Sequence, residues 1–229
     1  MKYQIASLIV EMRPEGKTLL ARSAPYLTAS DRKADIQINI DRGRLVRMRK
    51  ENPHLTDDDC EYIHTGEVFY KALLGFDGML VHASAVALDR EAYLFSAKSG
   101  GGKSTHAALW QKVFGERAHI VNDDKPALRR IDGKFMVFGT PWSGKTDLNT
   151  NESAPLKAIA FLEQGTKNKI TRLSAKEALL MLLNQTLRPA AEWNRLSSLL
   201  DRLIKEIPFY KLTCDISADA VRCAYDAMR

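Results

Sequence analysis

The sequence of 229 residues is 45% hydrophobic and 27% charged, a composition that fits a folded globular protein and excludes a disordered or low-complexity chain. Its formal net charge of +6 is compatible with a nucleic acid or an anionic substrate and selects neither. The longest apolar runs, such as residues 178–183, are far shorter than the roughly 18 residues that cross a bilayer, so no membrane partner is expected.

The N-terminus shows no secretory signal, and the cysteines are expected to be ordinary thiols. Residues 5–10 form a short apolar stretch, but charged residues follow directly and no small-residue cleavage site appears, so a secretory signal is not expected. Three widely spaced cysteines, Cys60, Cys214 and Cys223, fit neither a disulfide framework nor a zinc site. The predicted location is therefore cytoplasmic.

Residues 1–75 are predicted to form a β-rich layer. The pattern of apolar and polar residues indicates strands at 3–11, 36–40 and 45–49, and residues 67–74 carry apolar side chains at helical spacing. No segment rich in Pro, Gly or Ser separates this layer from the rest, so the whole chain is predicted to fold as a single domain.

Residues 76–229 alternate between short apolar runs and amphipathic segments, which predicts an α/β core with C-terminal helices. Gly115 ends one predicted helix, and Pro208 stops another. Ser174 and Glu177 form a capping box. The expected strands are 79–88, 92–96, 119–121, 135–138, 158–162 and 209–214, and the expected helices are 104–114, 174–187, 196–207 and one that Ser217 caps.

Residues 97–104, with the sequence AKSGGGKS, match a phosphate-binding loop, although Ala97 stands where the first glycine is usual. A strand is predicted before the loop and a helix after it, which would direct backbone N–H groups and the positive end of the helix dipole at an anion. Three consecutive glycines let the backbone approach phosphates closely. The alternative is a plain glycine-rich turn.

The roles expected in such a loop follow from the residue types. Lys103 is expected to reach the β- and γ-phosphates of ATP, and the hydroxyl of Ser104 is expected to ligate Mg²⁺. The predicted nucleotide-binding residues are Ser99, Gly100, Gly101, Gly102, Lys103, Ser104 and Thr105.

Two adjacent carboxylates, Asp123 and Asp124, close the strand that follows the loop helix. Ligands of α/β folds bind at the carboxyl ends of strands. A kinase needs one carboxylate for Mg²⁺ and another that accepts the proton of the acceptor hydroxyl. The alternative is a pair of acids in a surface turn.

A second glycine-containing segment, residues 139–146, also satisfies the loop pattern and follows an apolar run. The residues after it have the composition of a turn and offer no helix N-terminus. We expect a loop near the active site that contacts nucleotide or acceptor through Trp142 and Lys145, or else a plain connection.

Two features admit an ordinary structural interpretation. His82 lies in an apolar stretch, and a lone histidine there is more often a core residue. The basic run at 42–50 is followed by acidic residues and lacks interleaved aromatic residues, so a solvated surface is expected and a nucleic-acid partner is not.

Taken together, His82, the loop at 97–104 and the Asp123–Asp124 pair resemble the catalytic core of HPr kinase, over about residues 79–128. That family shares its core with phosphoenolpyruvate carboxykinase. The resemblance implies a P-loop fold like the C-terminal domain of HPr kinase, to which this chain adds its N-terminal β layer. The short interval from the loop lysine to the acidic pair is specific to this branch of P-loop proteins.

The resemblance also implies roles for individual residues. Asp124 matches the general base of that family, Lys103 the residue that holds phosphates, and Ser104 the residue that binds Mg²⁺. His82 matches a further active-site residue. A metal-binding glutamate and a catalytic arginine that the family carries later have no evident equivalent here. The interval 139–157 offers only Trp142, Lys145 and Lys157 in their place.

The sequence therefore predicts an ATP- and Mg²⁺-dependent kinase. Its acceptor is a hydroxyl of a protein, a peptide or a small metabolite. The alternative from another class is a nucleotide-sensing module that binds through the loop and transfers nothing. The family resemblance makes a homo-oligomer plausible, although the sequence carries no interface signature.

Overall fold

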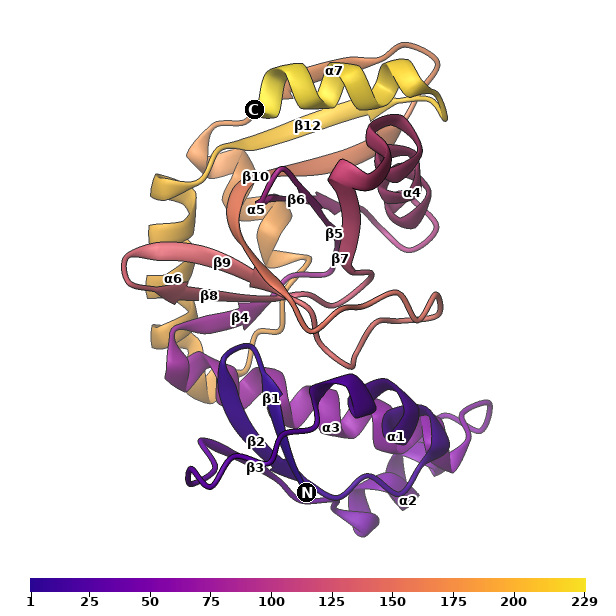
Figure 1. Cartoon of the computed structure of the whole chain (residues 1–229), viewed down its shortest axis with the longest axis vertical. Coiled ribbons are helices and arrows are strands. Elements are labelled where there is room, and N and C mark those ends of the chain that lie inside the picture. The colour runs from indigo at the N-terminus through magenta and orange to yellow at the C-terminus, as the bar shows by residue number, and fades with distance from the viewer.

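Two sheets organise the chain in the computed structural model, which describes residues 1–229 as a mixed α/β protein. A three-stranded sheet belongs to the N-terminal part, and a nine-stranded sheet belongs to the remainder. In Figure 1 the N-terminal elements lie in the lower part of the molecule and the larger sheet lies above them. None of the helices is both long and apolar enough to cross a membrane.

The N-terminal sheet begins with a hairpin of β1 (Lys2–Ile5) and β2 (Leu8–Met12). The two residues between these strands have left-handed φ angles of 51° and 60°, as a tight hairpin turn requires. The segment 3–11, predicted as a single strand, therefore forms two strands. The sequence does not reveal the turn, because it carries Ala and Ser in place of the usual Asn or Gly. β3 (Ile36–Ile38) pairs with β2 in parallel.

Helices occupy more of residues 1–75 than the three short strands do, so this part is not β-rich as predicted. The α-helices are α1 (Lys17–Ser23), α2 (Arg42–Glu51) and α3 (Asp57–Leu73). The strand expected at 45–49 lies inside α2, which has no buried residue. A helix without a buried face has no apolar periodicity to distinguish it from a strand.

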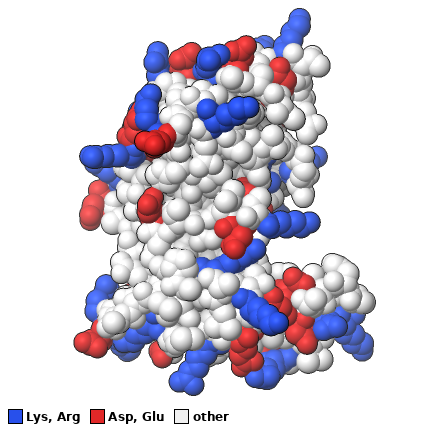
Figure 2. All heavy atoms as spheres, turned by 45° about the vertical axis from the view of Figure 1, so that its right-hand side comes forward, with Lys and Arg blue, Asp and Glu red and all other residues white.

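The four arginines of α2 form ion pairs with carboxylates. Arg42 pairs with Glu15 at 2.8 Å, and Arg49 pairs with Asp57 at 2.7 Å. On the face that Figure 2 shows, basic and acidic side chains are interspersed over the lower part of the molecule and form no single basic patch. The expectation of a solvated surface fits this arrangement.

The larger sheet is built around β10 (Ser153–Gln164), which pairs in parallel with both β6 (Glu91–Ser96) and β12 (Phe209–Cys214). β5 (Ala83–Leu88) lies between β6 and β7 (Ala118–Asn122) and is antiparallel to both. β6, β7, β10 and β12 therefore end at the same edge. The remaining strands of this sheet are β4 (Gly78–Leu80), β8 (Ala127–Ile131), β9 (Lys134–Phe138) and β11 (Lys169–Arg172).

Helices cover both faces of this sheet (Figure 1). α4 (Lys103–Phe114) and α7 (Ala218–Met228) share one apolar cluster with the sheet, while α5 (Ala175–Leu183) and α6 (Trp193–Glu206) share another. The strands alternate buried side chains between these two clusters, as a sheet with two covered faces requires. The predicted α/β class of this part is confirmed.

Most predicted elements of the core are present, with shifted ends. The strand expected at 79–88 is divided into β4 and β5, and His82 lies between them. The helix expected to continue to residue 187 ends at Leu183, and its capping box of Ser174 and Glu177 is present.

His106 is a buried residue of α4 that is expected to make the stability of the fold sensitive to acid. It is 3% exposed, and burial lowers the pKa of His106 from 6.5 to about 4. Between these two values the unfolded chain binds a proton that the folded chain does not, so the free energy of unfolding falls as the pH is lowered. The expected loss is about 3 kcal/mol.

Urea denaturation at a series of pH values between 7 and 4 measures this loss. In the His106→Phe variant the loss between about pH 6.5 and pH 4 should be smaller by most of that amount, because phenylalanine does not titrate. Parallel pH profiles for the two proteins would contradict the assignment to His106.

Candidate functional site

The glycine-rich loop joins β6 to α4 at the edge where the parallel strands end. Gly100 and Gly102 have φ angles of +76° and +93°, which favour glycine. Gly102 is the N-cap of α4, and the helix leaves the loop with no side-chain cap. Its first N–H groups are thus not satisfied by a capping side chain, as at a helix that binds an anion.

Ala97 fits this loop because Gly101 lacks a side chain. A Cβ atom at position 101 would lie 2.7 Å from the Cβ atom of Ala97 and 2.9 Å from the carbonyl oxygen of Lys98. The departure from the usual first glycine is therefore accommodated within the loop itself.

Lys103 and Ser104 are the first two residues of α4. The Lys103 side chain is buried and its Nζ donates to the carbonyl oxygen of Ala97 at 3.3 Å. Burial lowers the pKa of Lys103, although the nearby carboxylates of Asp124 and Asp123 oppose this effect. The Oγ atom of Ser104 donates to Oδ1 of Asp123 at 3.1 Å.

Asp123 is buried and connects three parts of the chain. Besides Ser104, its carboxylate accepts hydrogen bonds from the hydroxyl of Ser84 on β5 and, at 2.6 Å, from the hydroxyl of Thr146. The side chain is thereby oriented from three directions. Asp123 and Ser104 together present a carboxylate and a hydroxyl beside the glycine-rich loop.

Asp124 follows directly and has a left-handed φ of 87°. Its Oδ1 lies 2.9 Å from Nε2 of His82, and its Oδ2 forms an ion pair with Lys125. Burial would raise the pKa of Asp124, but the hydrogen bond from His82 and the charge of Lys125 outweigh burial and lower it. The carboxylate is therefore ionised at neutral pH.

His82 is held from the other side by a residue that the sequence did not indicate. Its Nδ1 lies 3.0 Å from Oε1 of Gln185, and its backbone N–H donates to the carbonyl oxygen of Gln185 at 2.7 Å. These contacts orient the imidazole toward Asp124. The ion pair of Asp124 with Lys125 is also not predicted from the sequence. The position of Lys125 directly after the acidic pair is the sequence feature that could have indicated it.

The second glycine-containing segment is a loop, as expected, and it is followed by the strand β10 and not by a helix. Trp142 is 1% exposed and stacks on Phe69 of α3 with ring centroids 4.8 Å apart. Its side chain therefore packs in the core and is not available to contact nucleotide or acceptor, which corrects that expectation. Lys145 is exposed.

Residues of the N-terminal part bind this loop next to the acidic pair through hydrogen bonds and an ion pair. Arg22 donates to the carbonyl oxygen of Gly144 at 2.6 Å and pairs with Asp147 at 2.8 Å. Tyr62 of α3 accepts the N–H of Gly144 at 3.1 Å. The loop lies so close to the site that a Cβ atom at position 144 would be 2.6 Å from that of Asp124.

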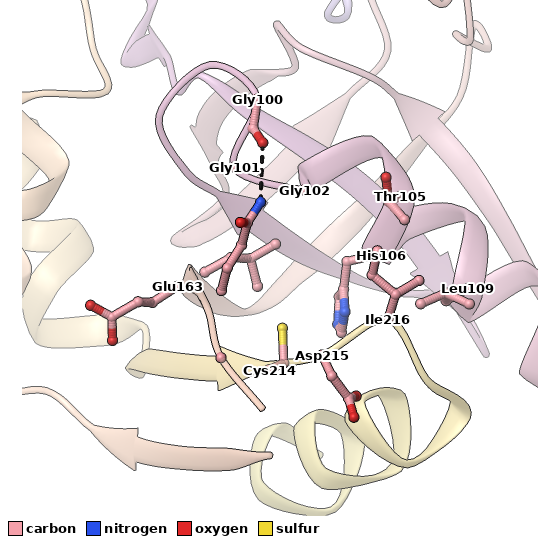
Figure 3. Close-up of a pocket in the computed structure, with 13 residues that line it drawn as sticks. Gly100, Gly101, Gly102, Thr105, His106, Leu109, Glu163, Cys214, Asp215 and Ile216 are labelled. Carbon is pink, nitrogen blue, oxygen red and sulfur yellow. Dashed lines mark hydrogen bonds between the residues drawn. The ribbon is translucent and has the colours of Figure 1, made fainter. Parts of the chain in front are cut away.

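A cavity of about 480 Å³ opens beside the glycine-rich loop. Figure 3 shows it between the loop, the first turns of α4 and the ends of β10 and β12. Its lining residues are Gly100, Gly101, Gly102, Thr105, His106, Leu109, Leu162, Glu163, Gln164, Gly165, Cys214, Asp215 and Ile216.

The comparisons with known proteins give a family and distant structural likenesses. The chain is similar to the solved structure of the Hpr(Ser) kinase/phosphatase from Coxiella burnetii, with 12% identity and a TM-score of 0.37. That similarity covers 65% of this chain and 92% of the other. No curated relative matches the sequence. The family model of the SynChlorMet cassette protein ScmC matches residues 55–220, well over half of the chain, and the protein therefore belongs to the ScmC family.

Proposed function

We propose that this protein is a kinase that transfers the γ-phosphate of ATP to a hydroxyl group. The observation that carries the proposal is the convergence of His82, Lys103 and the Asp123–Asp124 pair at one edge of the sheet. The motif resemblance to HPr kinase supports the same reading. The α-, β- and γ-phosphates would lie along the loop at 97–102, with Lys103 beside the β- and γ-phosphates.

Ser104 and Asp123 are the residues that would hold Mg²⁺. They supply a hydroxyl and a carboxylate oxygen, which are ligands that Mg²⁺ prefers, and phosphate oxygens and water would complete an octahedral shell. The protein has no cluster of three or more His, Cys, Asp or Glu side chains that could enclose a metal. The bound ion would neutralise charge on the transferred phosphoryl group.

Asp124 is proposed as the group that accepts the proton of the acceptor. The acceptor oxygen forms a bond to the γ-phosphorus, the bond from that phosphorus to the bridging oxygen breaks, and ADP leaves. The hydroxyl proton passes to the carboxylate of Asp124. Because the transition state of such transfers is loose, proton transfer occurs late and a weakly basic carboxylate suffices.

Lys125 is proposed to exchange partners during the reaction. In the structure its ammonium group forms an ion pair with Asp124. A γ-phosphate between Lys103 and Lys125 would compete for that ammonium group, and loss of the ion pair would make Asp124 a better proton acceptor. Lys125 would then supply the positive charge that an arginine supplies in the family that the motifs resemble.

The test is transfer of label from γ-labelled ATP with Mg²⁺ to an extract of the source cells. The acceptor is expected to be a protein, a peptide or a small hydroxylated molecule, and separation by size distinguishes these classes. Lys103→Ala should reduce labelling by at least about 10²-fold, since it removes a charge that stabilises the transferred group.

Lys112→Ala is the matched control, because Lys112 is an exposed lysine on the same helix and its loss should leave labelling unchanged. Labelling that persists in Lys103→Ala would contradict the proposal. ATP binding by the wild-type protein without any Lys103-dependent label would instead favour the nucleotide-sensing module.

A further inference from the structure

We infer that the cavity beside the glycine-rich loop is a nucleoside site, and that His106 donates a hydrogen bond to the bound base or ribose. The inference rests on the proposed function, because the loop at 100–102 both lines the cavity and would hold the phosphates. A triphosphate on the loop would place its nucleoside within reach of this cavity. The volume of about 480 Å³ lies within the range of small-molecule sites.

The charges of the residues that line the cavity favour the nucleoside of a nucleotide over its phosphate groups. The lining contains Glu163 and Asp215 and no lysine or arginine, so a phosphate group is disfavoured there. A neutral base and sugar have no such penalty. The cationic Lys103 lies on the loop side instead, which orients a bound nucleotide with its phosphates toward α4 and its nucleoside toward the cavity.

Apolar side chains from three different elements face this cavity. Leu109 comes from α4, Leu162 from β10, and Ile216 from the connection between β12 and α7. Ile216 is 78% exposed, which is an unfavourable position for a large aliphatic side chain. A flat aromatic base against these side chains would remove apolar surface from water.

His106 supplies the specific polar group. Its Nε2 accepts a hydrogen bond from Nε1 of Trp110 at 3.1 Å, so the proton of the neutral ring resides on Nδ1. This Nδ1 is buried and has no hydrogen-bond partner. A buried donor without a partner is costly, and an acceptor atom of a ligand would satisfy it.

The ring of His106 is fixed where it borders the cavity. Phe95 meets it edge to face at 4.6 Å between ring centroids, and Trp110 holds its other nitrogen. Figure 3 shows the ring between α4 and the end of β12, near Cys214 and Asp215. A ring nitrogen or exocyclic oxygen of a base, or a ribose oxygen, would serve as its acceptor.

A further contact ties the cavity to the phosphate loop. The side-chain amide of Gln164, at the end of β10, donates to the carbonyl oxygen of Gly100 at 3.4 Å. The dashed line at Gly100 in Figure 3 marks this hydrogen bond. This hydrogen bond is long, so a ligand that offers a better acceptor to Gln164 would displace it at little cost. The end of β10 would therefore contact both the nucleoside site and the phosphate-binding loop.

Calorimetric binding of Mg-ATP and of Mg-tripolyphosphate tests the inference, because only ATP carries a nucleoside. Leu109→Trp fills the cavity and should weaken ATP binding at least about tenfold. His106→Phe keeps an aromatic ring and removes both the donor at Nδ1 and the acceptor of Trp110, and should weaken ATP binding about three- to tenfold. Neither variant should alter tripolyphosphate binding. Leu180→Trp, at an exposed position on α5, is the control for a new surface tryptophan.

The outcomes separate this inference from the proposed function. If wild-type protein binds both ligands and the two cavity variants bind ATP as wild type does, the nucleoside site is wrong and the phosphate site stands. Weakening of ATP and tripolyphosphate to the same extent in both variants also overturns it. If the wild-type protein binds neither ligand, the proposed function falls and the inference falls with it.

Discussion

Replacement of Asp124 by asparagine is expected to reduce phosphoryl transfer by about 10²- to 10⁴-fold, the contribution typical of a general base. The affinity for Mg-ATP should stay within about threefold of wild type, because Lys103, Ser104 and the glycine-rich loop hold the phosphates in the proposed site. Asparagine has the shape of aspartate and tolerates the left-handed φ of 87° at this position. Backbone strain is therefore not the expected cause of the loss.

The measurement pairs the rate of label transfer with the dissociation constant for Mg-ATP from calorimetry. Asp132→Asn is the matched control, since Asp132 is exposed, also has a left-handed φ (48°), and lies in the turn between β8 and β9. Its transfer rate should equal that of wild type. Loss of ATP binding together with transfer in Asp124→Asn would contradict the role of proton acceptor.

The parts of the site that the sequence predicts are those encoded by short-range spacing. A strand, a glycine-rich loop and a helix follow one another within 91–114, and the acidic pair closes the next strand. Each of these depends on neighbours in the chain, such as Gly102 before α4 and Gly115 after it. The strand and the helix that flank the loop are accordingly predicted to within a few residues.

The contacts that join distant segments could not be predicted in the same way. Gln185 meets His82 across 103 positions of the chain, and Arg22 meets Gly144 across 122. Such pairs depend on how the sheet orders its strands and on how the N-terminal helices dock, and no local pattern specifies either. The same limit explains Trp142, whose partner Phe69 lies on a helix far away in sequence.

The N-terminal part contacts the site in two ways: Tyr70 donates to the carbonyl oxygen of Lys125, and three other residues hold the loop at 139–152. Arg22 and Tyr62 hold Gly144, while Tyr26 donates to Asn149 at 2.8 Å. The same loop places Thr146 on the carboxylate of Asp123. A change in how these N-terminal residues hold the loop would therefore alter the positions of both carboxylates of the acidic pair. The close approach of Gly144 to Asp124 allows this coupling to be tested by a substitution.

Replacement of Gly144 by alanine is expected to reduce transfer by about 10²-fold, the effect of displacing a reacting group by about 1 Å. The new Cβ atom would meet Cβ of Asp124 at 2.6 Å and its Oδ2 at 2.9 Å, so either the loop or the carboxylate must move. Gly133→Ala is the matched control, because Gly133 has a φ of +79° and open space around it. Both variants should lose about 1–2 kcal/mol of stability from the left-handed conformation, as thermal unfolding measures. Only Gly144→Ala should lose transfer activity, and equal activity of the two variants would mean that the loop does not set the position of Asp124.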